Sequence, residues 1–235
     1  ATWYNNATAK TFVSPRFGIS YPITDRGVLH FSYGHFLQIP SFIFLYQKPE
    51  FKIIEQDGTQ GIFGNADLEP QKTVMYEIGL QQQFGEDYSG DFTMFYRDIR
   101  DWVTTTSPIP IGSVNSARKY TQYTNEDYAN ARGITVSFNK QQGSNLALSL
   151  SYTFQIVEGL NSNPDDKNSR ELGGADSVRY LSALNWDQTH TANLSVGYSE
   201  RNDWGVFLIG RYGSGLPYTP SLNQADFRGE DASNG

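Results

Sequence analysis

Three histidines are the side chains best suited to acid–base chemistry, and their positions suggest one candidate pair. His30 and His35 are five residues apart in a stretch of alternating polarity, so they point to opposite faces of a strand and do not share a metal ion. His190 follows Asp187 at the start of another such stretch, where the two could form a hydrogen bond. Such a pair serves either hydrolysis or the capping of a strand. We favour the cap, because the spacing singles out no Ser/His/Asp triad.

The polar residues 161–168 form a second candidate site, because oxygen ligands recur there at alternate positions as they do in calcium loops. The stretch lacks the central Gly and the distal Glu of such loops, and Pro164 interrupts it. The chain also has no Cys, which excludes a thiolate metal site and a cysteine nucleophile. We therefore expect a solvated acidic loop, with no catalytic residue, no metal and no cofactor.

Composition narrows the class of protein. The 18 Lys and Arg residues against 25 Asp and Glu residues give a net charge of −7, which argues against a nucleic-acid partner. No apolar stretch reaches the 18 residues of a membrane-spanning helix, and the first residues show no signal-peptide pattern. Only 38% of the residues are hydrophobic although 14% are aromatic, which is typical of apolar surface spread in thin, alternating layers.

Apolar residues alternate with small or polar ones along most of the chain, and this period of two indicates β-strands. In residues 146–154 every even position is large and apolar. The same pattern recurs at residues 29–34, 73–81, 92–96, 134–138 and 194–198. The stretch 204–212 is less regular, because Phe207 and Ile209 share a face with Arg211. No window has a clear helical period, so we predict an all-β chain.

The connections between the expected strands alternate in length. We expect strands at about 12–22, 27–37, 72–84, 90–104, 118–140, 145–157, 190–200 and 204–214. Short turns at 24–27, 85–87, 141–144 and 201–203 alternate with long loops at 38–71, 105–117 and 157–189. This alternation places all short turns at one end of an antiparallel sheet. A soluble up-and-down barrel is compatible with it, but the strand at 118–140 is about twice as long as the 9–11 residues that cross a bilayer. Such long strands are typical of large outer-membrane barrels, with short periplasmic turns and long extracellular loops.

Aromatic residues gather near the expected strand ends, as they do in the interfacial girdles of membrane barrels. Tyr21, Phe84, Tyr88 and Trp204 flank the short turns. Those near the long loops are Phe36, Trp102, Tyr120, Tyr123, Phe154 and Tyr212. The preference of aromatic residues for strands is the alternative explanation.

Several stretches resemble the TonB-dependent receptor family of outer-membrane transporters. They are residues 15–22, 30–36, 64–73, 76–79, 185–191 and 213–220. The stretch 64–73 is similar to the family's N-x-x-L-x-P-E-x-[ST] entry to a barrel strand, with Gln71 where Glu is usual. The resemblance covers nearly the whole chain, and the order and spacing of the stretches make it specific.

The resemblance implies a barrel of about 22 strands around an N-terminal plug domain. About eight strands are present, and we find no plug-like stretch, no TonB-contacting segment and no terminal aromatic strand. We therefore expect residues 1–235 to be a partial transmembrane β-barrel domain of a larger protein in the outer membrane. The expected partners are the lipid bilayer, a TonB-type energy-coupling complex that acts through the plug, and a surface lipoprotein.

The resemblance also implies a function. The receptor would bind and import a bulky, scarce nutrient such as a metal chelate, a cofactor, a glycan or a peptide. An outer-membrane enzyme of the protease or phospholipase type and a structural or adhesive surface barrel are the alternatives. The enzyme would depend on His190 and Asp187.

Two groups of residues are candidates for the transport site. By strand parity, the residues that should face the barrel lumen are His30, Glu77, Gln81, Arg97 and Arg211. We expect them mainly to contact a plug, because charged groups in a packed lumen are normally paired. The aromatic residues Phe42, Phe44, Tyr46 and Phe51 lie in the long loop 38–71, where they would either grip a ligand or pack against a neighbouring loop.

Overall fold

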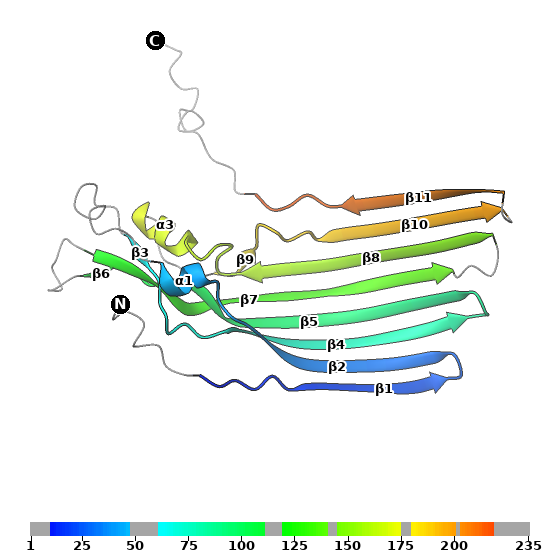
Figure 1. Ribbon diagram of the computed structural model, residues 1–235, viewed down its shortest axis with the longest axis horizontal. Coiled ribbons are helices and arrows are strands. Elements are labelled where there is room, and N and C mark those ends of the chain that lie inside the picture. Colours follow the sequence, from blue (N-terminus) through cyan, green and yellow to red (C-terminus); the bar gives the residue numbers. More distant parts are fainter. Residues whose placement is uncertain are drawn as a thin grey trace, which may run out of the picture.

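The computed structural model describes residues 10–47, 61–110, 119–140, 145–174, 180–200 and 203–218. Eight long strands lie side by side in one antiparallel sheet, in the order β1-β2-β4-β5-β7-β8-β10-β11 (Figure 1). They are β1 (Arg16–Thr24), β2 (Gly27–Gln38), β4 (Gln71–Phe84), β5 (Tyr88–Thr105), β7 (Lys119–Lys140), β8 (Leu146–Gly159), β10 (His190–Glu200) and β11 (Trp204–Gly213). Each long strand pairs with its neighbours in the sequence of long strands, so the sheet is a meander.

Shorter elements gather at the end of the sheet opposite the tight turns (Figure 1). They are the helices α1 (Phe42–Tyr46) and α3 (Asp166–Leu172) and the two-residue strands β3 (Ile62–Phe63), β6 (Ile109–Pro110) and β9 (Ser182–Ala183). Among the described residues, the edge strands β1 and β11 each pair with a single long strand. The sheet is therefore open.

The continuous register gives the sheet two chemically different faces. Cross-strand partners share a face, and the row Phe31, Ile78, Met94, Ile134, Phe154 runs across five strands on what we call the apolar face. Residues of this face that are 37–67% exposed include Phe17, Ile19, Tyr21, Phe31, Ile78, Phe92, Met94, Leu150, Val206 and Leu208. The opposite, polar face carries the row Thr93, Thr135, Thr153, Thr191. So large an exposed apolar surface indicates contact with something other than water.

Aromatic residues border the apolar face at two levels. Tyr33, Tyr76 and Tyr96 are cross-strand neighbours, with ring centroids 5.1 and 6.4 Å apart, and Arg132 continues their row. Nearer the tight turns the Tyr88 ring lies 5.9 Å from that of Phe138, and the Tyr198 ring 5.4 Å from that of Trp204. Tyr76 to Phe84 is nine residues of β4. This length matches the 9–11 residues in which a tilted strand crosses a membrane.

The eight predicted strands are all present, with ends that differ by at most four residues. The two helices were not predicted, because five and seven residues are too short to show a period. Phe36 and Tyr123, which we expected in a girdle, have the parity of the polar face instead. The predicted turn at 141–144 and the start of the one at 201–203 lie outside the described residues. None of the described helices is long and apolar enough to cross a membrane.

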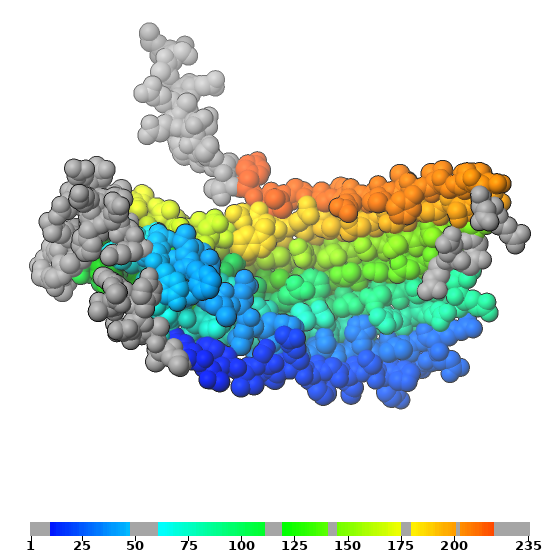
Figure 2. Space-filling view, viewed as in Figure 1, coloured from blue at the N-terminus to red at the C-terminus, as the bar shows by residue number. Residues whose placement is uncertain are grey.

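We call Tyr33, Tyr76 and Tyr96 the tyrosine row. Strands β5, β7 and β8 continue past this row, away from the tight turns, and support the long loops. We call the described residues 39–47, 61–70, 160–174 and 180–189 the cap. One apolar cluster joins Leu184 of the cap to Ala129, Ala131 and Val157. A second joins Leu68 to Val103 and Tyr123, with Phe44, Leu45 and Ile62 packed against it. The strand residues of both clusters have the parity of the polar face, so the loops fold over that face. Figure 2 shows α1 lying over one end of the sheet.

Gly133 is required by close packing in the middle of β7. A Cβ atom there would lie 2.3 Å from the backbone oxygen of Phe154 and 2.8 Å from the Phe95 ring, so the strands would have to move apart. Gly210 is a matched control, because a Cβ atom added there would have Leu194 Cβ as its nearest neighbour, at 3.7 Å.

We predict that Gly133→Ala lowers the free energy of unfolding by about 1–3 kcal/mol. Gly210→Ala should change it by less than about 0.5 kcal/mol. Urea unfolding followed by tryptophan fluorescence measures both. Equal stabilities of the two variants would contradict the close contact.

Candidate functional site

The side chain of Asn125, in β7, holds the cap residues 61–70 in place. Its Nδ2 donates to the carbonyl oxygens of Glu69 at 3.0 Å and Asp101 at 2.7 Å, and its Oδ1 accepts from the Glu69 N–H at 2.8 Å. Asp101 is the only described non-glycine residue with a positive φ, 56°, and it lies in a bulge of β5. Its carboxylate pairs with Lys72 at 2.7 Å. This contact, with a second to Glu69, raises the Lys72 pKa.

The segment 64–70 then carries α1. Asn65 donates from Nδ2 to the Tyr123 carbonyl at 3.0 Å, and its backbone N–H donates to the Phe44 carbonyl at 2.9 Å. Gly64 N–H donates to the Gln47 carbonyl at 2.7 Å. A Cβ on Gly64 would lie 2.6 Å from the Gln47 nitrogen, so only glycine allows this approach. The stretch whose sequence resembled a family motif is thus the support of α1.

Helix α1 has a packed side and an exposed side. The Phe44 ring lies 4.9 Å from that of Tyr123 and supports the cap. Phe42 is 75% exposed and Tyr46 44%, and their rings stack at 6.1 Å. Ile43, which sequence reasoning missed, is exposed beside them. Of the four predicted ligand contacts, Phe42 and Tyr46 therefore present exposed aromatic surface, Phe44 packs inward, and Phe51 lies outside the described residues.

Polar contacts hold the cap residues 160–174 on β7. The Tyr123 hydroxyl donates to Asp165 at 3.0 Å, Thr121 donates to Asn168 at 3.2 Å, and Asn161 donates to Asp127. Alternate residues of β7 thus bind α3 and the turn before it. Burial, with the Asp165 carboxylate, raises the Tyr123 pKa above its ordinary value of 10.0.

The five residues predicted to face a lumen share the polar face. His30 is the cross-strand neighbour of Gly79, next to the pair formed by Ser32 and Glu77, whose side chains are hydrogen bonded at 3.1 Å. The register also places Gln81, Arg97 and Arg211 on this face. They do not form one cluster, because Arg211 is on the last strand and Arg97 is near the cap. That this face lines a lumen stays a prediction.

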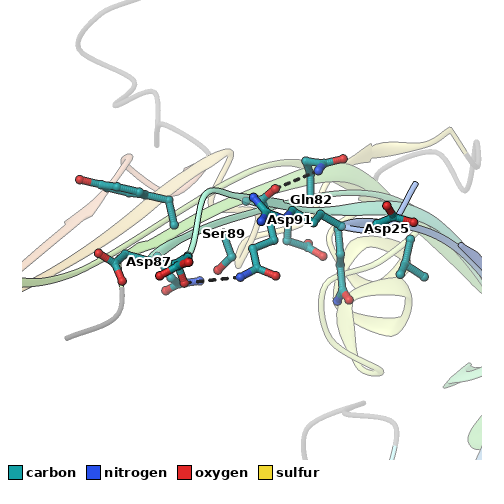
Figure 3. Close-up of a pocket in the computed structure, with 13 residues that line it drawn as sticks. Asp25, Gln82, Asp87, Ser89 and Asp91 are labelled. Atoms are coloured by element: carbon teal, nitrogen blue, oxygen red, sulfur yellow. Dashed lines mark hydrogen bonds between the residues drawn. The ribbon is translucent and has the colours of Figure 1, made fainter. Parts of the chain in front are cut away.

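A hollow of about 540 Å³ lies at the tight-turn end of the polar face. Figure 3 shows Asp25, Asp87 and Asp91 around it. Hydrogen bonds from Gln82 to the Gln83 carbonyl and from Gln83 to the Glu86 carbonyl hold its wall. Its lining makes this end of the polar face acidic.

The candidate chemistry of the sequence is distributed differently in the structure. His190 Nδ1 lies 2.8 Å from the Tyr152 hydroxyl, whereas Asp187 is buried and accepts from the Val157 N–H at 3.1 Å. The two side chains therefore bind different partners, and the hydrogen-bonded pair that the sequence suggested does not form. In the stretch 161–168, Asp166 accepts from the N–H groups of Ser162 and Asn163.

We predict that Asn125→Ala frees the segment 64–70, because it removes three hydrogen bonds in a partly buried place. At about 1 kcal/mol each, their loss should speed hydrogen exchange at the Glu69 amide by about tenfold or more. Gln81→Ala, on the same face at the other end of the sheet, should leave that rate unchanged. Identical exchange rates at Glu69 in both variants would show that the Asn125 hydrogen bonds do not hold this segment.

Comparisons with known proteins agree with this architecture. The family model described as TonB dependent receptor-like, beta-barrel matches residues 2–234. The ferric-catecholate import receptor Fiu of E. coli K12 is 18% identical, with a TM-score of 0.56 over 86% of this chain and 24% of that one. The ferric enterobactin receptor PfeA of Pseudomonas aeruginosa is 16% identical, with a TM-score of 0.58 over 83% and 27%. The copper transporter OprC is 19% identical, with a TM-score of 0.52 over 84% and 25%.

At these identities the solved structures show a shared fold alone, and the chain spans about a quarter of their length. A comparison with curated proteins finds no match. The family model, however, covers nearly every residue, and the open meander with one apolar and one polar face agrees with it. The chain belongs to the TonB-dependent receptor-like β-barrel family.

Proposed function

We propose that the chain is the wall and part of the mouth of an outer-membrane receptor that binds and imports a bulky, scarce nutrient. The match of the β-barrel family model to residues 2–234 carries this proposal. The apolar face, bordered by aromatic rows, then contacts lipid, and the polar face lines the interior. Transport needs the rest of the protein: further strands, an interior plug domain and contact with a TonB-type energy-coupling complex. A surface lipoprotein remains a further candidate partner.

The exposed side of α1 is the proposed place of first contact with the nutrient. Phe42 and Tyr46 offer a stacked aromatic surface, and Ile43 adds apolar area beside them. The hydrogen bonds of Asn125 and the close contact between Gly64 and Gln47 fix this surface on β7. Little ordering is therefore needed when a ligand binds. Aromatic faces can pack against sugar rings, metal-chelating aryl groups and apolar side chains alike. The surface therefore supports binding of a bulky ligand without selecting among metal chelate, cofactor, glycan and peptide.

Untargeted mass spectrometry of spent medium tests the import. Cells with the complete receptor should deplete at least one compound that cells lacking its gene leave behind. Uptake of that compound by washed cells should stop when a protonophore collapses the proton gradient. A compound converted to a new product without need of the gradient would instead support the enzyme. Identical media from both strains would overturn the proposal.

The contribution of α1 can be measured with the compound so identified. We expect Phe42→Ala and Tyr46→Ala each to weaken its binding by about tenfold, since each removes one aromatic stacking contact. Tyr21→Ala is the matched control, because Tyr21 is 67% exposed on the apolar face, far from the cap. Equal affinities of all three variants for the compound would show that α1 does not contribute to binding.

A pair of adjacent residues tests the assignment of the faces. Leu150 is on the apolar face and Ser151 on the polar face, at mid-height of β8. For the receptor refolded in phospholipid vesicles, we expect Leu150→Lys to cost about 2–4 kcal/mol in urea unfolding. Ser151→Lys should cost clearly less. The reverse order would show that the polar face, not the apolar one, meets the lipid.

A further inference from the structure

A second, smaller hollow lies on the polar face close to the cap. It has a volume of about 240 Å³ and is lined by Arg16, Phe17, Gly18, Ser32, Tyr33, Gly34, Phe36 and Met75. Gly18 and Gly34 have no side chains and leave its floor bare. A Cβ on Gly34 would lie 3.0 Å from the Phe36 ring and 3.4 Å from Arg16 Cγ, so these two side chains lean across the glycine and form one wall.

Two arginines lie on the same row as this floor. The register pairs Arg16 with Gly34, Gly34 with Met75, and Met75 with Arg97. Three strand spacings, about 14 Å, therefore separate the Cα atoms of Arg16 and Arg97, with the hollow and Met75 between them.

Both guanidinium groups are held by aromatic rings rather than by acids. Arg16 lies over the Phe36 ring at 4.5 Å, and Arg97 lies over the Phe95 ring at 5.1 Å. In the described part of the chain neither forms an ion pair, whereas Lys72, Arg100 and Arg132 all do. Stacking fixes the plane of a guanidinium and leaves its N–H groups able to donate to a planar oxyanion.

The local charge favours an anion. Glu77 is the nearest acidic residue on the polar face, and its carboxylate accepts from Ser32 at 3.1 Å. Asp98, next to Arg97, has the parity of the apolar face and pairs with Arg100. The two arginines exceed it by one positive charge, although the whole chain carries −7. The hollow at the tight-turn end of this face has an acidic lining instead.

We propose that this hollow binds a carboxylate, which Arg16 holds on the Phe36 wall and Arg97 attracts from the far side. Its bare floor and its volume suit a flat group, such as an aryl carboxylate. The carboxylate belongs either to a soluble ligand that has passed the cap or to a side chain of the same protein inside the barrel. The proposal rests on the proposed function only in that the polar face lines the interior.

Cysteine labelling in the complete receptor tests the site. Ser32→Cys places a thiol of nearly the same size in the hollow, and the chain has no other Cys. Cysteines elsewhere in the receptor are replaced first. We compare the reaction rates of an anionic sulfonatoethyl and a cationic trimethylammonioethyl methanethiosulfonate, each divided by its rate with a free thiol. The ratio of the anionic to the cationic rate reports the charge around the thiol, to which the Glu77 carboxylate beside residue 32 also contributes. Adding Arg16→Gln should lower the ratio of the two rates by about threefold or more.

Further arms distinguish the sources of the carboxylate. If a soluble ligand is the occupant, millimolar benzoate should slow labelling, and benzamide, its neutral analogue, should not. If a side chain of the receptor is the occupant, the thiol should resist both reagents and become reactive once Arg16→Gln is added. Arg100→Gln, on the opposite face, is the matched control and should change nothing.

Three results would overturn the carboxylate site. The first is a rate ratio that Arg16→Gln leaves unchanged, the second is equal protection by benzoate and benzamide, and the third is a thiol that stays unreactive after Arg16→Gln. None of these measurements depends on import. Failure of the site is therefore distinct from failure of the receptor to take up a nutrient.

Discussion

The cross-strand register is the constraint on which the rest of the structure depends, and between the described long strands it shifts only near the end of β1 and in the β5 bulge. Because each strand pairs residue for residue with the next, a side chain on β2 and one on β10 are assigned to a face by the same alternation. A slip of one residue in any strand would move its apolar residues to the polar face. The apolar band, the tyrosine row and the pair of arginines near the cap all lie in rows that the two register shifts do not reach.

The cap uses the same register for a different purpose. Where β5 and β7 continue past the tyrosine row, the polar-face parity carries Ala129, Tyr123 and Val103, and these residues become the floor of two small apolar cores. Hydrogen bonds from Asn125 and Asn65 then fix the loop that carries α1. Apolar packing stabilises the contact between the loop and the strands, and the side-chain amide hydrogen bonds fix the position of the loop.

Sequence reasoning recovered the strands because alternation is a local signal, visible within six to eight residues of any strand. It also placed His30, Glu77, Gln81, Arg97 and Arg211 on one face, since parity follows directly from a correct strand assignment. The cap was beyond its reach. Asn65 meets the carbonyl of Tyr123 across a separation of 58 residues, and no local pattern announces that contact. Phe42 and Phe44 are two residues apart and chemically identical, so only the position of α1 reveals that one is exposed and the other packed. The hollow beside Arg16 likewise depends on two glycines from different strands.

The length of β7 separates two kinds of sequence constraint within one strand. Its 22 residues, Lys119–Lys140, include Tyr123 in the floor of the cap and the turn-side aromatic residue Phe138. The part beside the lipid-compatible band must preserve only alternation and residue size, which many sequences satisfy. The part under the cap must match particular loop residues. A lineage can therefore exchange its loops together with the cap end of β7, and the two-faced sheet beneath them stays unchanged.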